Sequence, residues 1–472
     1  MKKYVLCLFA TGICAIVCAD SQSQDSIAPS SSTGHAKTSI ASAKGPYELT
    51  FEDFDWQTGD SKPLPNSATG LGERMPTEKA IDLFRKRVER GASDYASRTV
   101  LGELYLRQAT EEDCLPAYSL AMGVLQDALR IKPDYKPAIL WSAKVMMAQH
   151  QFADALKLIG EGIPADSQSP ADLAIIVDCH LDMGNVDQAK VVLEQLAKLE
   201  KSPPIDARLA RLAELTGNRE KAIQIVRSSL DTVKAGSADE TEWHWYQWRL
   251  AGLVFDSGDL DESELLVQKI LDDSANDERA SILLARIAFA KNQVSRAQGL
   301  LEQVVKLHPS PPVLAMLGDL FQHQGEKVKA TECWGKAEEL IREEAAIAKA
   351  AHAREAAIFF ADHDRHVNEA MDLILLDRNQ RKDFNTADAF AWILFKNQQW
   401  NEAAAEIKAL MQKQSNDLLS LYHATKIHQA LGNIDAAKGH LQKVVDVNPR
   451  FSIQHAADIA RLQSEWKLSR SR

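Results

Sequence analysis

From about Pro76 to the C-terminus, apolar residues recur at the three- and four-residue spacings that are typical of amphipathic helices. No stretch in this region alternates apolar and polar residues between turn signals, so we expect no sheet. A small residue begins every second predicted helix. These residues are Ala121, Ala155, Ala189, Ala222, Ser263, Ala297, Ala330, Ala370, Ala403 and Ala437. Their successive spacings are 34, 34, 33, 41, 34, 33, 40, 33 and 34 residues, which indicates a tandem repeat of two-helix units.

Turn signals and helix-ending residues occur at matching places in these units. Pairs of glycine and a polar residue predict tight turns between the two helices of a unit. The pairs are Gly184-Asn185, Gly217-Asn218, Gly258-Asp259, Gly325-Glu326 and Gly432-Asn433. Pro133, Pro309 and Pro449 are expected to end second helices, because proline cannot continue a helix. One unit cannot bury its apolar face alone, so we expect the units to stack.

The unit around Ala330 carries the pattern most fully. It contains Leu317-Gly318, Phe321, Gly325, Ala330, Trp334 and Ala337. This pattern resembles the tetratricopeptide repeat, and the resemblance runs from about Asp94 to Pro449. It implies an all-α fold, namely a right-handed superhelical solenoid of antiparallel helix pairs. Most units lack the family's tryptophan near the start of the first helix, and the units before Ala189 and Ala222 lack its large–small pair.

The pattern predicts an array of about ten units over residues 76–449, followed by a capping helix and tail over residues 450–472. The 41-residue spacing predicts a longer loop across Val233 to Glu242, whereas the 40-residue spacing predicts a lengthened helix across the alanine-rich stretch from Ile341 to Glu355. Residues Thr77 to Arg90 are expected to begin the array. A terminal helix from Phe451 to Leu468 is expected to cover its last apolar edge.

The N-terminus has the features of an export signal over residues 1–19. Lys2 and Lys3 precede an apolar stretch, and Val17 and Ala19 are small enough for cleavage after Ala19. Lipidation at Cys14 or Cys18 and an uncleaved anchor are the alternatives, and either would place the chain on a membrane. We therefore expect an exported protein, periplasmic or extracellular. Residues 20–75 are predicted to be a flexible linker and an extended segment, in which residues 47–56 would cap the first helices.

Charge and cysteine usage narrow the class of function. Cleavage would leave 53 basic and 66 acidic residues, a net charge of −13, which disfavours nucleic acid as a partner. Cys114, Cys179 and Cys333 are too widely spaced for a disulfide framework or a C-x-x-C metal site, and we expect them to be buried apolar side chains.

Candidate chemistry is sparse. The cluster from His363 to His366 falls where a turn joins two helices, so we interpret it as a solvated turn, not a metal site. His423 and His428 are five residues apart, not the four that aligns two ligands on a helix, and we interpret them as ordinary helix residues. The sequence lacks nucleophile and phosphate-loop motifs, so we expect no enzyme, no cofactor and no metal.

In the tetratricopeptide family the first helix of each pair lines the concave face, and the register names the positions that this implies here. They are Trp245, Trp248, Phe255, Arg286, Phe289, Phe359, Trp392, Phe395, Tyr422 and Lys426. An aromatic groove with a few cations would suit an extended or helical peptide with apolar anchors. The alternative is that these rings pack between neighbouring units. At least one ring of the run from Trp243 to Trp248 should be exposed or contact a ligand, because a helix cannot bury all its sides.

The family's clamp for the C-terminal carboxylate of chaperones is not expected, since Ala315 and Asp319, or Asp388 and Trp392, stand at its places. The predicted function is an exported protein-interaction scaffold that binds a protein or peptide in the concave groove. The alternatives are an envelope assembly platform that uses its convex surface, and a small-ligand or carbohydrate binder that uses the tryptophan-rich run.

Overall fold

The computed structural model describes residues 76–111, 114–236, 240–348, 352–412 and 416–471. These residues form 22 α-helices, one short 3₁₀ helix and no strand, so the predicted all-α fold is confirmed. The predicted export signal, the linker over residues 20–75 and the segment over residues 47–56 lie outside the described residues.

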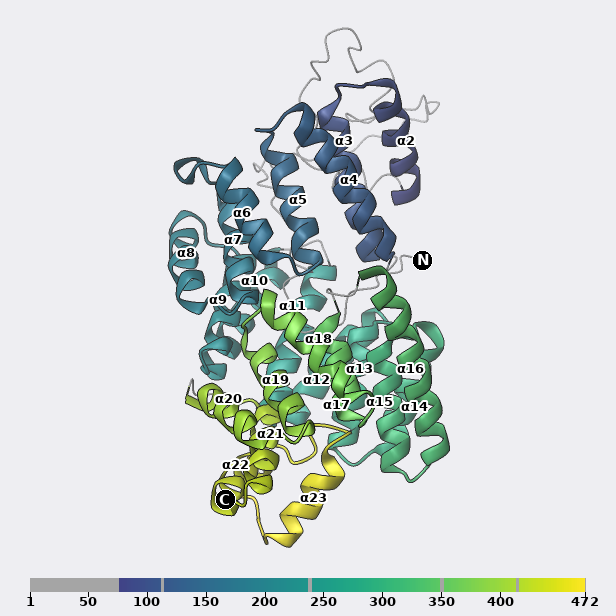
Figure 1. Cartoon of the computed structure of the whole chain (residues 1–472), viewed down its shortest axis with the longest axis vertical. Coiled ribbons are helices and arrows are strands. Elements are labelled where there is room, and N and C mark those ends of the chain that lie inside the picture. The colour runs from purple at the N-terminus through teal and green to yellow at the C-terminus, as the bar shows by residue number, and fades with distance from the viewer. Residues whose placement is uncertain (1–75, 112–113, 237–239, 349–351, 413–415, 472) are drawn as a thin grey trace, which may run out of the picture.

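Ten antiparallel helix pairs follow α2 (Thr77–Arg90) and precede α23 (Ala456–Glu465) (Figure 1). In each pair we call the earlier helix the first helix and the later one the second helix. The pairs are α3 (Tyr95–Glu111) with α4 (Leu115–Ile131), α5 (Lys136–Ala148) with α6 (Phe152–Gly162), α7 (Pro170–Asp182) with α8 (Val186–Leu199), α9 (Pro203–Leu215) with α10 (Arg219–Gly236), α11 (Glu240–Asp256) with α12 (Leu260–Asp273), α13 (Glu278–Ala290) with α14 (Val294–Leu307), α15 (Pro311–His323) with α16 (Lys327–Ala348), α17 (Ala353–Asp362) with α18 (Val367–Gln380), α19 (Phe384–Lys396) with α20 (Trp400–Gln412), and α21 (Leu418–Ala430) with α22 (Ile434–Val447).

The ten recurring small residues are fully buried where the two helices of each pair meet. A Cβ atom added at Gly318 would lie 2.6 Å from the Trp334 ring, which shows how closely α15 and α16 approach. Ser263 replaces alanine in its unit, and its hydroxyl donates a hydrogen bond to the Ala251 carbonyl at 2.8 Å. The small residues therefore recur at the repeat spacing because each lies where the two helices of its unit approach most closely.

The turns inside the pairs also repeat. Most place a residue with positive φ five positions before the small residue. These residues are His150, Gly184, Gly217, Gly258, Asn292, Gly325, Gln398 and Gly432. In the turn between α17 and α18 the left-handed residues are Asp364 and His366. A left-handed residue ends the first helix and reverses the chain, which explains the glycines at five of these places.

The first helices lie on the inside of the curved array. First helices of consecutive units contact each other in several places, among them α3 with α5, α5 with α7, and α19 with α21. Consecutive second helices have no comparable contacts among the described residues. We call the surface formed by the first helices the inner face. The second helices form the outer layer.

The array curves so strongly that units five or six apart touch. The Lys382 backbone N–H donates a hydrogen bond to the Met183 carbonyl at 3.1 Å, and α4 contacts α16. The Arg219 guanidinium donates to the Asp256 carbonyl at 2.9 Å and to the Asn416 carbonyl at 3.4 Å. In Figure 1, helices α17 to α19 accordingly lie in front of α11 and α12.

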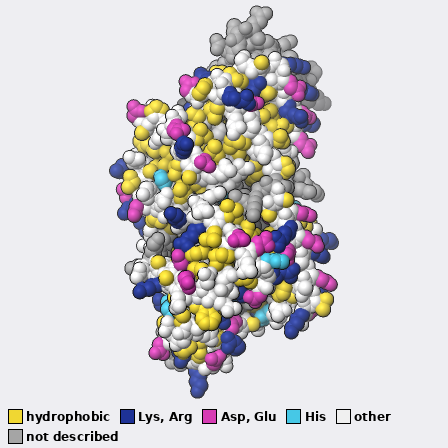
Figure 2. All heavy atoms as spheres, in the orientation of Figure 1, with side chains coloured by type: hydrophobic (Ala, Val, Ile, Leu, Met, Phe, Trp, Pro, Cys, Tyr) yellow, Lys and Arg dark blue, Asp and Glu magenta, His cyan; other side chains and the backbone are white. Residues whose placement is uncertain are grey.

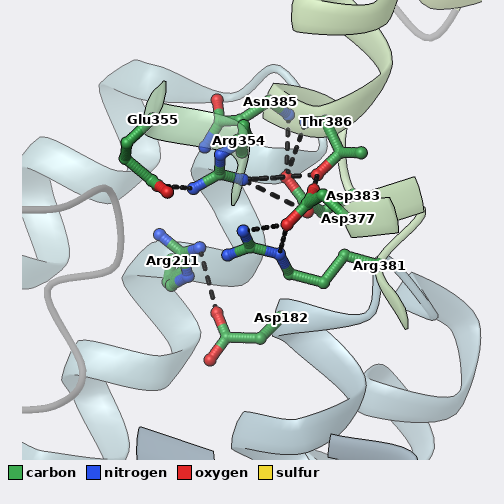
Figure 3. Close-up of polar contacts among 9 residues, drawn as sticks. All are labelled: Asp182, Arg211, Arg354, Glu355, Asp377, Arg381, Asp383, Asn385 and Thr386. Carbon is green, nitrogen blue, oxygen red and sulfur yellow. Dashed lines mark hydrogen bonds and ion pairs between the residues drawn. The ribbon is translucent and has the colours of Figure 1, made fainter. Parts of the chain in front are cut away.

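A cluster of buried charges lies at one of these contacts (Figure 3). Arg354 contacts Asp383 at 3.4 Å and Glu355 at 3.1 Å, and Arg381 is paired with Asp377. On the other side of the contact, Asp182 is paired with Arg211 at 3.4 Å. Burial raises the pKa of Asp182 to about 6, although Arg211 opposes this shift. The neighbouring His150 is held neutral, because burial lowers its pKa to about 3. Ion pairs from two distant parts of the array therefore lie close together here, away from solvent, and influence each other's charges.

Two predicted features differ from the structure, and a third is present. The stretch from Val233 to Glu242 is not a long loop, because α10 continues to Gly236 and α11 begins at Glu240. Val233, near the end of α10, is buried. The terminal helix spans only Ala456–Glu465, since residues 451–455 form turns. The lengthened helix near residue 341 is present as α16, which has 22 residues and ends at Ala348.

Substitutions at two glycines distinguish two effects on the free energy of unfolding. One is backbone strain, and the other is disruption of the contact between distant units. Gly184 and Gly432 have φ values of +76° and +75°. A Cβ atom at Gly184 would lie 2.5 Å from the Lys382 carbonyl oxygen, whereas nothing lies within 4 Å of one at Gly432. We expect Gly432→Ala to lower the free energy of unfolding by about 1 kcal/mol, through left-handed strain alone. Gly184→Ala should cost about 1–3 kcal/mol more. Urea unfolding measures both, and equal losses would show that the contact adds little.

A second prediction concerns pH. Asp417 caps α21 by accepting a hydrogen bond from the Ser420 backbone N–H at 2.8 Å. Burial, together with Asp388 and Asp256, raises the pKa of Asp417 to about 6, while Arg219 lowers it. Between about pH 4 and 6, the folded chain therefore binds a proton at Asp417 that the unfolded chain does not bind. The bound proton increases the free energy of unfolding at low pH, and this contribution is lost as the pH rises through 6.

Asp417→Asn keeps the cap and removes the charge. Relative to wild type, its free energy of unfolding should increase from pH 4.5 to pH 7.5 by about 2 kcal/mol, at about 1.4 kcal/mol per pKa unit. Urea unfolding at the two pH values is the measurement. Asp277→Asn, at the cap of α13, controls for exchange of the cap itself. A constant difference between Asp417→Asn and wild type would contradict the expectation.

Candidate functional site

The ten predicted groove positions are mostly covered. Six are buried, namely Trp245, Phe255, Phe289, Phe359, Trp392 and Tyr422. The other four, Trp248, Arg286, Phe395 and Lys426, are half-buried. None of the ten is fully exposed, so the aromatic positions do not line an open groove. The structure places most of these rings as the alternative interpretation does, packed among neighbouring helices.

The tryptophan-rich run on α11 is covered in the same way. Trp245 packs edge-on against Tyr246, with ring centroids 4.8 Å apart. Trp243 and Trp248 are half-buried, and the Arg279 guanidinium lies 5.5 Å from the centre of the Trp248 ring. Of this run, these two indoles are the aromatic rings that still reach the surface.

Trp392 is the centre of an aromatic cluster on the inner face of α19 and α21. Its ring stacks on His423, with centroids 4.2 Å apart and an interplanar angle of 11°. Its indole N–H donates a hydrogen bond to Asp362 at 2.7 Å. His423 is also hydrogen-bonded to Asp388 at 2.9 Å. His423 lies within α21, and its ring is part of this buried cluster.

The chain's own residues 450–458, which we call the C-terminal segment, cover this cluster. His455 stacks on Tyr422, with centroids 4.4 Å apart, and lies edge-on to Trp392 at 6.0 Å. The Tyr422 hydroxyl donates a hydrogen bond to Asp458 at 3.0 Å. The Lys426 ammonium reaches the same carboxylate at 2.8 Å.

The other end of the C-terminal segment lies on α13. The Arg450 guanidinium lies 4.3 Å from the centre of the Phe289 ring, and its Nε donates a hydrogen bond to the Phe289 carbonyl at 3.1 Å. Ile453 and Ala456 pack into the apolar cluster that contains Phe289 and Leu317. Four of the ten predicted positions, Phe289, Trp392, Tyr422 and Lys426, thus contact a peptide segment supplied by the same chain.

The charges at this contact are matched. Burial alone would raise the pKa of Asp458, but hydrogen bonds from Lys426 and Arg461 hold it below its ordinary value. Burial and the adjacent Asp458 raise the pKa of Tyr422, so its hydroxyl remains a donor. Burial and the neighbouring His423 lower the pKa of His455 well below its ordinary value, which keeps the stacked imidazole neutral.

The turn from His363 to His366 is solvated in part, since Asp364 and His366 are exposed. The His363 side chain is buried, and its two ring nitrogens are hydrogen-bonded to Asp319 at 2.9 Å and to the Phe359 carbonyl at 2.8 Å. Burial would lower the pKa of His363, but the hydrogen bond with Asp319 raises it. Arg365 and His366 both contact Glu338. Carboxylates on α15 and α16 hold this turn in the packed array.

Other chemistry is limited in the part of the chain that the structure describes. No three His, Cys, Asp or Glu side chains there are grouped to hold a metal ion. Cys179 is buried, Cys114 and Cys333 are half-buried, and all three are free thiols. Over the described ranges, no helix has the length and apolar character needed to cross a bilayer. The inner face offers stacked rings, cations and carboxylates, which are groups for holding a peptide segment.

The comparisons with known proteins agree with the helix-pair architecture. The family model described as tetratricopeptide repeat matches residues 117–175 and 254–320. Together with the ten helix pairs, these two matches support a tetratricopeptide repeat protein. The fold supports a protein-interaction scaffold in general, and repeat proteins of this family are typically not enzymes.

Two solved structures are also similar to this chain. One is yeast Tom70, with 13% sequence identity, a TM-score of 0.35, and coverage of 85% of this chain and 94% of the other. Another is a tetratricopeptide repeat protein from Parabacteroides merdae, with 18% identity, a TM-score of 0.39, and coverage of 56% and 93%. No curated protein matches the sequence.

Sequence reasoning missed the contact residues Arg450, His455 and Asp458. It treated this region as a cap on the last unit, because repeat spacing describes only neighbouring units. The contact between Arg450 and Phe289 joins residues 161 positions apart, and no local pattern marks it. The sequence marks this contact only by a short stretch after Pro449 in which a charged residue, Arg450, is followed by the apolar residues Phe451 and Ile453.

The Tyr422 hydroxyl provides a test of this contact. Tyr422→Phe removes the hydrogen bond to the Asp458 carboxylate and should lower the free energy of unfolding by about 1.5 kcal/mol. Urea unfolding is the measurement. Tyr95→Phe, at a ring that packs edge-on against Tyr135, controls for hydroxyl removal elsewhere. Equal effects of the two substitutions would count against the importance of this hydrogen bond.

Proposed function

We propose that the chain is an exported scaffold that binds a segment of a partner protein along the inner face of its array. One observation carries the proposal: the inner face already holds the C-terminal segment through Phe289, Trp392, Tyr422 and Lys426. These side chains supply stacking, a hydroxyl donor and a cation, which are the contacts used to grip peptides. The partner is a protein or peptide, and the net charge of −13 after cleavage favours a neutral or basic one.

The earlier units offer inner-face residues that are less covered. On α5, Leu140, Lys144 and Met147 are spaced along one side of the helix and are half-buried, as is Trp141. The Lys144 ammonium lies 4.2 Å from the centre of the Trp141 ring. Figure 2 shows hydrophobic side chains gathered over the part of the molecule where α5 and α6 lie. An apolar surface with a cation beside an indole suits an apolar anchor on a partner segment.

Export is proposed from Lys2, Lys3 and the apolar stretch that precedes Ala19. The alternatives of a lipidated or uncleaved N-terminus remain part of this proposal. The mass of the N-terminal peptide in envelope and soluble fractions distinguishes the three.

A second candidate function, an envelope assembly platform, has one observation in its favour. All ten exposed large apolar side chains of the described residues lie on second helices. They are Leu120, Ile131, Val191, Leu199, Leu265, Leu307, Val328, Leu375, Trp400 and Ile434. They are spread over eight helices, and scattered apolar residues are common on protein surfaces. The tryptophan-rich run offers a carbohydrate little surface, because Trp245 is buried and Arg279 lies over the Trp248 ring.

Photo-crosslinking in the producing cells separates the two candidates. A photoreactive phenylalanine replaces Lys144 on the inner face of α5 or, in the matched variant, Val191 on the outer layer at α8. We expect a crosslinked partner from position 144 and none from position 191, because the inner face is the proposed binding surface. Crosslinks from position 191 alone would favour the outer-layer platform and contradict the proposal.

A further inference from the structure

The C-terminal segment binds the inner face through two polar anchors with apolar contacts between them. Arg450 is anchored on Phe289 at one end, and Asp458 is anchored by Tyr422 and Lys426 at the other. Between these anchors, Ile453 and Ala456 are buried in an apolar cluster, and His455 stacks on Tyr422. All of these are contacts that a separate peptide of the same chemistry could make.

The segment does not satisfy every polar group at the contact. Buried atoms without a hydrogen-bond partner include Nε2 of His423 and Oδ1 of Asp388 on the inner face. Nη2 of Arg450 and Nδ2 of Asn448 are in the same condition on the segment side. Unsatisfied buried polar atoms destabilise a contact. A different segment that supplied hydrogen-bond partners to His423 Nε2 and Asp388 Oδ1 would therefore bind more tightly than the resident one.

We infer that the inner face of α13, α19 and α21 is an exchangeable peptide site, and that residues 450–458 are its resident ligand. The inference rests on the proposed function and adds the chemistry of the partner. That partner is a peptide segment with a cation, then small apolar residues, and a carboxylate about eight residues after the cation. The resident ligand is covalently attached, so its effective concentration is on the order of millimolar, and it holds the site closed to weak competitors.

A fluorescent peptide with the sequence of residues 448–466 serves as the probe, and anisotropy measures its binding to the full chain. Asp458→Lys in the chain places a cation beside Lys426 and should release the resident segment. Glu465→Lys is the matched control, because it makes the same charge change on α23 at an exposed residue that is paired with Arg461. We expect Asp458→Lys to bind the probe at least tenfold more tightly than either wild type or Glu465→Lys.

A charge exchange tests whether the probe occupies the same site. Lys426→Glu in the chain repels the resident Asp458 and also repels the native probe. This variant should prefer a probe that carries Asp458→Lys by at least tenfold, whereas the Asp458→Lys chain should prefer the native probe.

Three results would overturn the inference. One is a folded Asp458→Lys chain that binds the probe no better than Glu465→Lys. Another is the absence of a reversed preference in Lys426→Glu. The third is cooperative unfolding caused by Asp458→Lys, which circular dichroism would detect, because a resident ligand can leave without unfolding the array. If the probe exchanges but position 144 yields no crosslinked partner, the proposed function alone fails. If position 144 crosslinks but the probe does not exchange, the inference alone fails.

Discussion

Contact between units five or six apart is the constraint on which the rest of this structure depends. Each unit adds a small rotation, and the array closes only because certain turns approach a distant backbone without a side chain between them. A Cβ atom at Gly184 would lie 2.5 Å from the Lys382 carbonyl oxygen, and one at Gly258 would lie 2.6 Å from that of Val447. These glycines therefore serve two purposes, since they supply the left-handed turn and leave room for the distant units.

Closure changes the environment of inner-face residues on the later units. In an open array, Phe289 and Trp392 would border solvent, whereas here they are buried by the packed array and by the chain's own C-terminal segment. Charged groups drawn into the same region need partners, because an isolated buried charge is strongly destabilising. The pairs of Asp182 with Arg211 and of Asp377 with Arg381 meet this need. Burial of the aromatic positions and pairing of the charges are thus two consequences of one geometry.

The sequence predicts well what is local to one unit. The small residues such as Ala297 and Ala330 recur because two adjacent helices must touch, and all ten are fully buried. Five of the left-handed turns are marked by glycine, but His150, Asn292 and Gln398 take the same conformation without that signal. Contacts between distant units could not be predicted, because they depend on rotations that accumulate over five or six units. The contact of Arg450 with Phe289 follows from such rotations, whereas His363 and His423 are buried against the adjacent units.

The anchors of the C-terminal segment lie on units that the curvature of the array brings together. Phe289 belongs to α13, and Tyr422 and Lys426 belong to α21, four units further along the chain. A ligand that binds both helices fixes the distance between them. Binding of the ligand and the curved conformation of the array therefore stabilise each other. By the same linkage, a partner segment of different length or charge binds best to a different curvature, and its binding energy is available to change the contacts between distant units.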